Sequence, residues 1–374
     1  MKLWHYLFLA VLTILLFGQY IFNPMIAGAD TWFYINQICN IQPHVSNDVI
    51  FDTLTLFMPC NFIFLKIWLA ILFFIMLIFS AKIGELYDKD NGWILSLIVG
   101  FFTLFSLEYI VFENDSLGFS LMFAALYFVL KAYKNKDKWL SKDNCLGLGF
   151  IILAGLCWKG AAYWLFPFAI LTPIYLVPLI GVIVLYGGSF LWFLTADRNV
   201  QEQTMWIGII YLGLTPLFSF GFMKMSKKEL LACILMIIPC IFVQKLYILA
   251  IPFISIMALL GLLSLTKYKD TIISTIIIFS VFMAIFWGMH TYQEFPTADD
   301  FVVVQQAAQD TNYVENAFGI GYIAIYNDLN VSSWSGTDGN DFICSGYVLS
   351  HPWLYDCNYC PVIKKAQNII LYKC

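Results

Sequence analysis

Long apolar segments separated by short lysine-rich loops dominate this chain of 374 residues. A helix that crosses a bilayer needs roughly 17–25 mostly apolar residues. Segments of this kind cover residues 4–22, 62–81, 93–112, 117–133, 205–222 and 271–290. Only 12% of the residues are charged, whereas soluble domains carry about 25%. The pattern therefore predicts a polytopic membrane protein, and it excludes a disordered chain, a nucleic-acid-binding protein or a soluble α/β enzyme as the main body.

The lysine positions predict how the remaining apolar residues are divided. Cytoplasmic loops of membrane proteins are enriched in lysine and arginine. Lysines cluster at four places along the chain, and Lys2 lies near the N-terminus. The clustered lysines are Lys82 and Lys89, then Lys131, Lys134, Lys136, Lys138 and Lys142, then Lys224, Lys227 and Lys228, and finally Lys267 and Lys269. These share one side only if residues 145–195 cross three times and residues 230–264 cross twice. We therefore expect about eleven spans in the cell membrane, with a cytoplasmic N-terminus and an extracytoplasmic C-terminal tail.

The last part of the chain changes in character. Residues 1–290 are expected to form the transmembrane domain, and residues 291–374 a small extracytoplasmic α/β domain that rests on it. Asp299 and Asp300 precede an apolar run at 301–308 that reads as a helix. Strands are expected at 322–326, 342–349 and 369–372.

The cysteines and the Ala27-Gly28-Ala29 sequence each allow more than one interpretation. Six cysteines fall outside on this topology, namely Cys39, Cys60, Cys344, Cys357, Cys360 and Cys374. An even number in an oxidising compartment favours disulfides or free thiols. Zinc binding by Cys357-x-x-Cys360 with His351 is the alternative. The sequence Ala27-Gly28-Ala29 also allows the first segment to be a secretory signal, although its apolar core is long for one.

Acidic residues gather in three of the predicted outer turns. Asp30 follows the first span, Glu113 and Asp115 form the turn between spans three and four, and Asp197 and Glu202 follow span seven. Carboxylates that converge repel one another, and a divalent cation relieves that repulsion. Oxygen-only ligands suit Mg²⁺ or Mn²⁺. We predict a metal site at Asp30, Glu113, Asp115 and Glu202, with Asp30 and Glu202 also catalytic.

The acidic residues also have explanations that involve no function. Acids in outer loops can be solvated turn residues, and Glu108, one turn below Glu113, can be a packing residue. Lys245, Lys159 and Arg198 lie at the same membrane level, and we expect them to hold a substrate phosphate. The aromatic residues near the predicted boundaries, among them Trp32 and Trp164, are typical of an interface belt.

At these residues the chain resembles the polytopic glycosyltransferases of the GT-C type, specifically the catalytic-subunit family of oligosaccharyltransferase. That family places an aspartate in the first outer loop, where Asp30 lies, and a DxD or ExD pair in the next, where Glu113-x-Asp115 lies. A later motif ending in glutamate resembles Asn199-Val200-Gln201-Glu202. A basic residue before a proline-containing span, which contacts the lipid-linked phosphate in the family, corresponds to Lys245.

The resemblance implies transfer of a sugar or oligosaccharide from a polyprenyl-phosphate or polyprenyl-pyrophosphate donor to a protein, lipid or glycan acceptor at the outer face, assisted by Mg²⁺ or Mn²⁺. The family's Trp-Trp-Asp-Tyr-Gly motif is altered here, because the comparable stretch reads Ala317-Phe318-Gly319-Ile320-Gly321-Tyr322. The alternatives are a non-catalytic homologue that binds lipid-linked glycan, and a lipid or ion transporter that uses the same acids.

Overall fold

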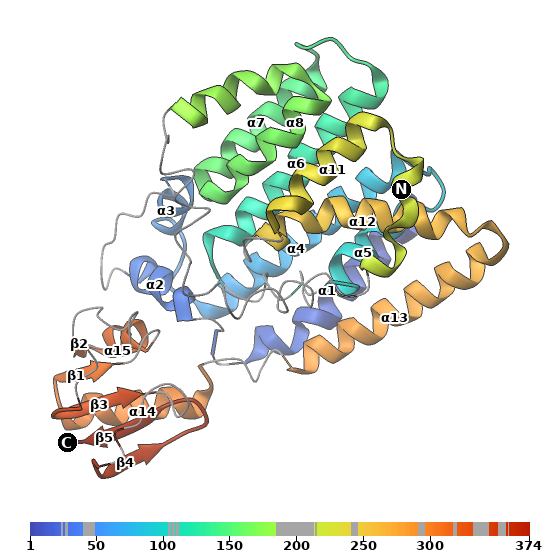
Figure 1. Ribbon diagram of the computed structural model, residues 1–374. Coiled ribbons are helices and arrows are strands. Elements are labelled where there is room, and N and C mark those ends of the chain that lie inside the picture. The colour runs from blue at the N-terminus through green and yellow to red at the C-terminus, as the bar shows by residue number, and fades with distance from the viewer. Residues whose placement is uncertain are drawn as a thin grey trace.

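The computed structural model describes residues 1–23, 25–26, 29–39, 49–103, 106, 109, 112–184, 213, 215–240, 246–290, 296–316, 320–331, 344–350, 357 and 359–374. Helices form a bundle, and a small sheet lies beside one end of it (Figure 1). The α-helices up to residue 290 are α1 (Leu3–Phe22), α2 (Ala29–Ile38), α3 (Val49–Thr55), α4 (Phe62–Glu85), α5 (Ile94–Phe101), α6 (Asn114–Asn135), α7 (Lys142–Cys157), α8 (Leu165–Leu171), α11 (Lys227–Cys240), α12 (Leu246–Ser264) and α13 (Lys269–His290). The 3₁₀ helices are η2 (Lys159–Trp164), η3 (Pro173–Tyr175), η5 (Thr215–Lys224) and η6 (Thr266–Tyr268).

Four helices in the described part of the chain are long and apolar enough to cross a membrane. They span Leu3–Phe22, Phe62–Glu85, Asp115–Asn135 and Lys269–His290, and they coincide with predicted spans. Shorter apolar helices occupy Gly160–Leu171, Pro173–Val184 and Ile248–Ser264. The predicted span at 93–112 is helical from Ile94 only to Phe101 in α5. The count of eleven spans stays a prediction, because all of the segment 185–212 lies outside the described residues.

Polar and glycine contacts hold the long helices together. The Ser120 hydroxyl of α6 donates to the Leu72 carbonyl of α4 at 3.0 Å and contacts the Tyr109 hydroxyl at 3.2 Å. Helices α1 and α13 lie side by side (Figure 1). A Cβ atom at Gly288 would lie 2.3 Å from the Leu15 carbonyl oxygen, so only glycine permits this approach. Such close backbone contact is typical of membrane helices, which associate through packing instead of apolar burial.

Ion pairs gather at one end of the bundle, where the lysine clusters lie. The N-terminal amino group pairs with Glu85, Lys131 with Asp143 at 3.0 Å, Lys134 with Glu229 at 3.3 Å and Lys269 with Asp88 at 3.3 Å. These pairs join the ends of α1, α4, α6, α7, α11 and α13. The lysines that the sequence assigns to one side therefore share one end of the structure.

The C-terminal part forms a mixed sheet with two helices. Its elements are α14 (Ala298–Asp310), β1 (Tyr313–Asn316), α15 (Gly321–Tyr326), β2 (Asn330–Val331), β3 (Tyr347–Ser350), β4 (Val362–Lys365) and β5 (Ile370–Lys373). The strand order is β2-β1-β3-β5-β4. Strand β1 is parallel to β2 and β3, whereas β5 is antiparallel to β3 and β4. The expected α/β character is confirmed, but the strand predicted at 322–326 is wrong, since these residues form α15.

One buried aspartate fastens α14 to the sheet. The carboxylate of Asp300 accepts hydrogen bonds from the Thr297 N–H at 2.9 Å, the Asn368 N–H at 2.8 Å and the Asn368 side chain at 2.7 Å. Thr297 is the N-cap, and it forms a capping box with Asp300 at the third helical position. The expected start of a helix near Asp299-Asp300 is therefore confirmed, with Thr297 as its capping residue.

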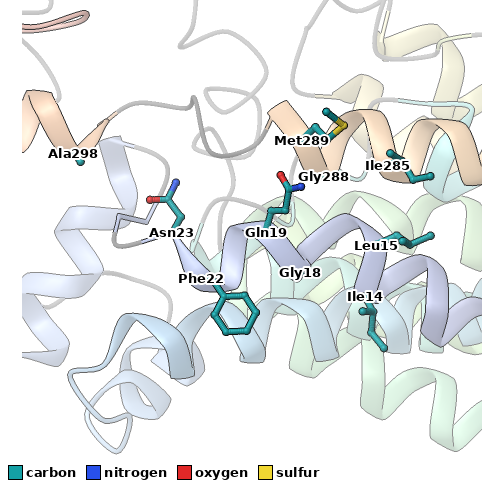
Figure 2. A pocket seen from close by; sticks show the side chains of 10 residues that line it. All are labelled: Ile14, Leu15, Gly18, Gln19, Phe22, Asn23, Ile285, Gly288, Met289 and Ala298. Atoms are coloured by element: carbon teal, nitrogen blue, oxygen red, sulfur yellow. The ribbon is translucent and has the colours of Figure 1, made fainter.

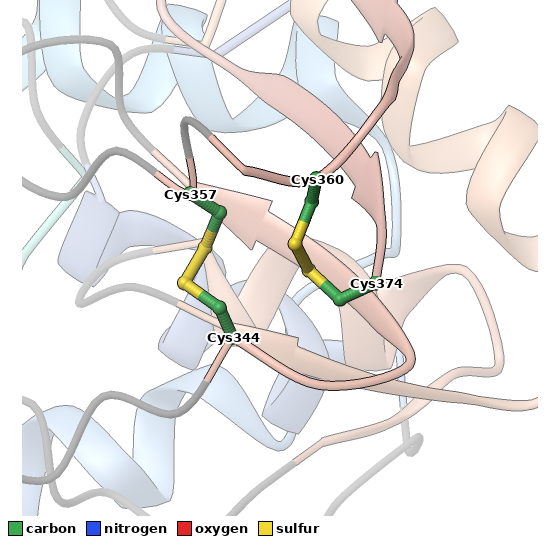
Figure 3. The surroundings of a disulfide bond; sticks show 4 residues. All are labelled: Cys344, Cys357, Cys360 and Cys374. Atoms are coloured by element: carbon green, nitrogen blue, oxygen red, sulfur yellow. A yellow bond between two sulfur atoms is a disulfide. The ribbon is translucent and has the colours of Figure 1, made fainter.

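Three disulfides lie outside the lysine-rich end of the bundle. Cys39–Cys60 joins the residues after α2 to those before α4. Cys344–Cys357 links the residues before β3 to those between β3 and β4, and Cys360–Cys374 links the residues before β4 to the residue after β5, as Figure 3 shows. The zinc alternative for Cys357-x-x-Cys360 is thereby excluded, because each of its two sulfur atoms is bonded to a different cysteine.

Trp32 of α2 joins the helical bundle to the C-terminal domain. Its ring lies 5.0 Å from the Tyr326 ring and 5.6 Å from the Phe301 ring of the C-terminal domain, and 5.6 Å from the Phe62 ring of α4. Trp32 is completely buried, and Trp164 is nearly so. Their assignment to an interface belt is wrong, because other side chains and not headgroups surround them. Helix α15 of the C-terminal part contacts α2 of the helical bundle, whereas the division into a transmembrane and an extracytoplasmic domain stays a prediction.

Candidate functional site

A long-range hydrogen bond connects the two acidic loops that the sequence singles out. The Phe112 N–H donates to the Thr31 hydroxyl at 2.9 Å, and both groups are buried. Thr31 follows Asp30 directly in α2, and Phe112 precedes Glu113 directly before α6. The backbones that carry the first predicted aspartate and the first predicted glutamate are therefore neighbours, although 83 positions (113 − 30) separate them in sequence.

Aromatic packing supports this connection. The Phe112 ring lies 5.6 Å from the Phe51 ring of α3, which in turn lies 4.9 Å from the Tyr34 ring of α2. Phe112 and Phe51 are completely buried. Tyr34, Phe51 and Phe112 thus extend the hydrophobic core of the bundle beneath the acidic turn, and the Cys39–Cys60 disulfide links the residues that flank this segment.

Glu113 and Asp115 stand at the N-terminus of α6. Glu113 is the N-cap with extended backbone angles (φ −135°, ψ 165°), and its carbonyl accepts a 2.8 Å hydrogen bond from the Ser116 hydroxyl. Asp115 lies in the first turn, where a carboxylate also stabilises the helix dipole. Both side chains are partly exposed, so the pair is accessible beside the end of the helix.

The Trp158-Lys159 segment reaches the same end of α6. The Trp158 ring lies 5.0 Å from the Phe119 ring, and a Cβ atom at Gly118 would come within 3.0 Å of Trp158. Lys159 begins η2 immediately afterwards. The Trp164 indole at the end of η2 donates to the Leu249 carbonyl of α12 at 3.2 Å. Segment 158–164 is therefore fixed between the first turns of α6 and of α12.

The structure describes only part of the predicted site. The side chains of Asp30 and Lys159, and all of Glu108, Glu202, Arg198 and Lys245, lie outside the described residues. Among the residues that are described, no group of three histidines, cysteines, aspartates or glutamates is placed to hold a metal ion. The oxygen donors of Glu113 and Asp115 fit Mg²⁺ or Mn²⁺ in kind, and the four-carboxylate site stays a prediction.

Two residues near the site were not selected from the sequence. Thr31 carries no sequence signal of its own, because its partner is distant in the chain. Lys66 does carry one, as a charged residue in the first turn of a membrane span. It is completely buried, donates to the Asn23 carbonyl at the end of α1 and lies 4.8 Å from the centre of the Tyr20 ring. Lys66 thus holds the end of α1 from which the Asp30 loop departs.

A groove of about 840 Å³ opens between α1 and α13, and Figure 2 shows the side chains around it. It is lined by Ile14, Leu15, Gly18, Gln19, Phe22, Asn23, Ile285, Gly288, Met289 and Ala298. Phe22 and Met289 are exposed. Most of the lining is apolar and belongs to two membrane spans, and the acidic turn at Glu113 does not contribute to it. Neither Glu113 nor Asp115, the two acids of the candidate site whose side chains are described, lines the groove.

Comparison with known proteins finds a similarity in fold and none in sequence family. The sequence matches no protein-family model and no curated protein. The structure is similar to the crystal structure of the Archaeoglobus fulgidus oligosaccharyltransferase tethered by a disulfide bond to an acceptor peptide containing the NVT sequon. The TM-score is 0.58 at 12% sequence identity, over 88% of this chain and 64% of that chain. The chain therefore has an oligosaccharyltransferase-like fold and spans less than two thirds of that protein's length.

Proposed function

We propose that this protein is a membrane glycosyltransferase that moves a sugar or oligosaccharide from a polyprenyl-phosphate or polyprenyl-pyrophosphate donor to an acceptor. The bond between the anomeric carbon and the phosphate oxygen breaks, a bond from that carbon to the acceptor forms, and the acceptor's proton passes to a carboxylate. The lipid phosphate leaves. The oligosaccharyltransferase-like fold supports the class of reaction.

The observation that carries the proposal is the hydrogen bond between Thr31 and Phe112. It joins the Asp30 loop to the Glu113-x-Asp115 turn at 2.9 Å in a buried setting. A site that handles a phosphate leaving group benefits from carboxylates supplied by separate loops, because together they bind a divalent cation. In the proposal, Asp30, Glu113, Asp115 and Glu202 would hold Mg²⁺ or Mn²⁺, and a bound ion there would supply positive charge for the phosphate leaving group.

The remaining roles follow from charge and position. Asp30 or Glu202 accepts the acceptor's proton or orients the acceptor. Lys159, Arg198 and Lys245 bind the phosphate of the donor, and Lys159 follows Trp158, which packs against the first turns of α6. A lipid-carried donor agrees with the absence of a nucleotide-binding fingerprint from the sequence.

The distribution of charge and disulfides supports the outer face as the place of reaction. The lysine-rich end of the bundle carries the ion pairs, and the Cys39–Cys60 disulfide closes the loop beside the acidic turn. Lysine-rich ends face the cytoplasm, and disulfides persist in oxidising compartments. The N-terminus is then cytoplasmic, and the C-terminal domain and the candidate site are extracytoplasmic.

The acceptor is proposed only by class. The similar Archaeoglobus protein was crystallised with an acceptor peptide, which favours a protein acceptor over a lipid or a glycan. The sequence at 317–322 lacks the tryptophan pair and the aspartate of the family's motif, so we propose that recognition differs from that of an Asn-x-Ser/Thr site. Residues 317–319 lie outside the described residues.

The test is sugar transfer by membranes that contain the full-length protein and a labelled polyprenyl-linked sugar. Transfer should need added Mg²⁺ or Mn²⁺ and should be lost on chelation. Asp30→Ala and Glu113→Ala should each lower transfer at least about a hundredfold. Asp90→Ala, which removes an exposed acid at the lysine-rich end of the bundle, should transfer normally. Normal transfer by both site variants would refute the proposed mechanism, and binding of the donor without transfer would identify a non-catalytic homologue.

A further inference from the structure

Two loops at the lysine-rich end of the bundle combine exposed lysines with exposed apolar side chains. We define them as the basic loops, residues 136–142 from the end of α6 to the first residue of α7 and residues 222–228 from the end of η5 to the first residues of α11. Their exposed lysines are Lys136, Lys138, Lys142, Lys224, Lys227 and Lys228. Trp139 is 63% exposed, Leu140 80%, Phe222 43% and Met223 73%. Such apolar exposure beside like charges requires an explanation, because large exposed apolar groups mark interaction sites.

The acids near these loops do not neutralise the exposed lysines. Asp143 pairs with Lys131 at 3.0 Å, and Glu229 pairs with Lys134 at 3.3 Å. Both of these lysines are only partly exposed. Within the basic loops themselves, Asp137 is the one acidic residue. Six exposed lysines therefore face outward from a surface that contains a single carboxylate.

Specific contacts hold the two loops together as one surface. The Tyr133 and Ser226 hydroxyls lie 3.0 Å apart, and Glu229 accepts hydrogen bonds from the Tyr87 hydroxyl and from the Ser226 N–H, both at 2.9 Å. The Lys134 ammonium lies 3.6 Å from the centre of the Tyr87 ring. The basic loops are thus a built surface whose parts come from α6, α11 and the end of α4.

The first loop is also a tight turn with its apolar residues at the tip. The Asp137 N–H donates to the Ala132 carbonyl at 2.9 Å, and the Lys138 carbonyl accepts from the Ser141 N–H at 2.9 Å and the Asn144 side chain at 3.1 Å. Lys136 has a left-handed backbone (φ 56°, ψ 40°), at a helix end where glycine is the usual residue. Lysine is a costly residue at this position compared with glycine, and its side chain is exposed beside the apolar tip.

We infer that the basic loops bind the anionic phospholipid headgroups of the membrane leaflet at this end of the bundle. Each lysine close to an anionic surface strengthens association roughly fivefold. Trp139, Leu140, Phe222 and Met223 lie at the ends of membrane helices, where amphipathic rings and apolar side chains enter the headgroup layer. A negatively charged bilayer surface satisfies both kinds of side chain at once. This inference does not depend on the proposed glycosyltransferase activity.

The test measures headgroup preference for the full-length protein in liposomes that contain phosphatidylcholine and phosphatidylglycerol. Electron spin resonance with spin-labelled forms of both lipids gives their relative association with the protein. The wild type should prefer phosphatidylglycerol, and added salt should weaken the preference. The triple variant Lys136→Gln, Lys138→Gln, Lys142→Gln should reduce the preference at least about tenfold.

A charge-matched control separates this surface from total charge. Lys364→Gln, Lys365→Gln, Lys373→Gln removes the same charge from strands β4 and β5 and should leave the preference unchanged. Lys136→Gly alone should weaken the preference while keeping or raising the melting temperature, because glycine suits the left-handed turn. A wild-type preference in the Lys136/Lys138/Lys142 variant, or equal loss in the control, would overturn the inference and assign these loops to another partner.

Discussion

At the scale of single residues, Thr31 decides how two remote acidic loops meet. Thr31→Val keeps the side-chain volume but leaves the Phe112 N–H buried without its acceptor. An unsatisfied buried donor costs about 1–3 kcal/mol. The melting temperature in detergent should therefore fall by several degrees. Sugar transfer, measured well below that temperature, should fall about tenfold or more, because misplacement of site groups by about 1 Å is costly to catalysis.

The control for this variant is another threonine in a membrane helix. Thr275 in α13 is exposed, and its hydroxyl donates to the Thr271 carbonyl within the same helix. Thr275→Val should change neither melting temperature nor transfer appreciably. If Thr31→Val transferred sugar at the normal rate after losing stability, the hydrogen bond would be part of the fold alone.

At the scale of elements, the helix α14 depends on one buried carboxylate. Asp300→Ala removes the acceptor of three hydrogen bonds, two of them from Asn368. We expect a loss of about 2–4 kcal/mol in the stability of the C-terminal domain. Limited proteolysis of the full-length protein should then cut residues 298–374 faster. Asp299→Ala removes the exposed neighbouring acid and should cost less than about 1 kcal/mol, so equal effects of the two variants would contradict the structure.

Elements also show how far the sequence predicts this fold. The long apolar runs at 4–22, 62–81, 117–133 and 271–290 predict α1, α4, α6 and α13, because burial in lipid and helical hydrogen bonding both act within each segment. The short run at 322–326 is ambiguous by periodicity. In the structure Ile320, Ile323 and Ala324 are completely buried, which is the spacing of a helix and not of a strand. The strands β1 (Tyr-Val-Glu-Asn) and β4 (Val-Ile-Lys-Lys) each combine two apolar residues with two polar or charged ones, so neither stands out as an apolar run.

Only part of the candidate site was predictable, because its acids are recognisable in the sequence and its long-range contacts are not. Glu113-x-Asp115 stands out locally, because two acids stand close together in a chain with only 12% charged residues. Its contact with the Asp30 loop depends on Thr31 and Phe112, which are ordinary in composition and distant in sequence. The burial of Trp32 was unpredictable for the same reason. An aromatic residue near a span predicts an interface belt, and only the structure shows its distant partners Phe301 and Tyr326. Long-range pairing of this kind is a property of the fold and has no local pattern.

At the scale of the whole molecule, the two ends of the bundle differ in chemistry. The ion pairs of the lysine-rich loops join one end of the bundle, and the C-terminal sheet, which carries two disulfides, lies beside the other end (Figure 1). Asp90 is exposed at the first end, and Asp310 is exposed at the end of α14 in the C-terminal domain. The proposed orientation therefore predicts that these two positions face opposite sides of the membrane.

Cysteine labelling of intact cells tests this orientation directly. In a Cys145→Ser background, which removes an exposed free thiol, Asp310→Cys should react with a membrane-impermeant maleimide on intact cells. Asp90→Cys should react only after permeabilisation, because the cytoplasmic side is then open to the reagent. The background protein without an added cysteine should remain unlabelled in intact cells. Labelling of Asp90→Cys in intact cells would show that the protein has the opposite orientation. The carboxylate turn would then face the cytoplasm, where disulfides such as Cys39–Cys60 do not persist.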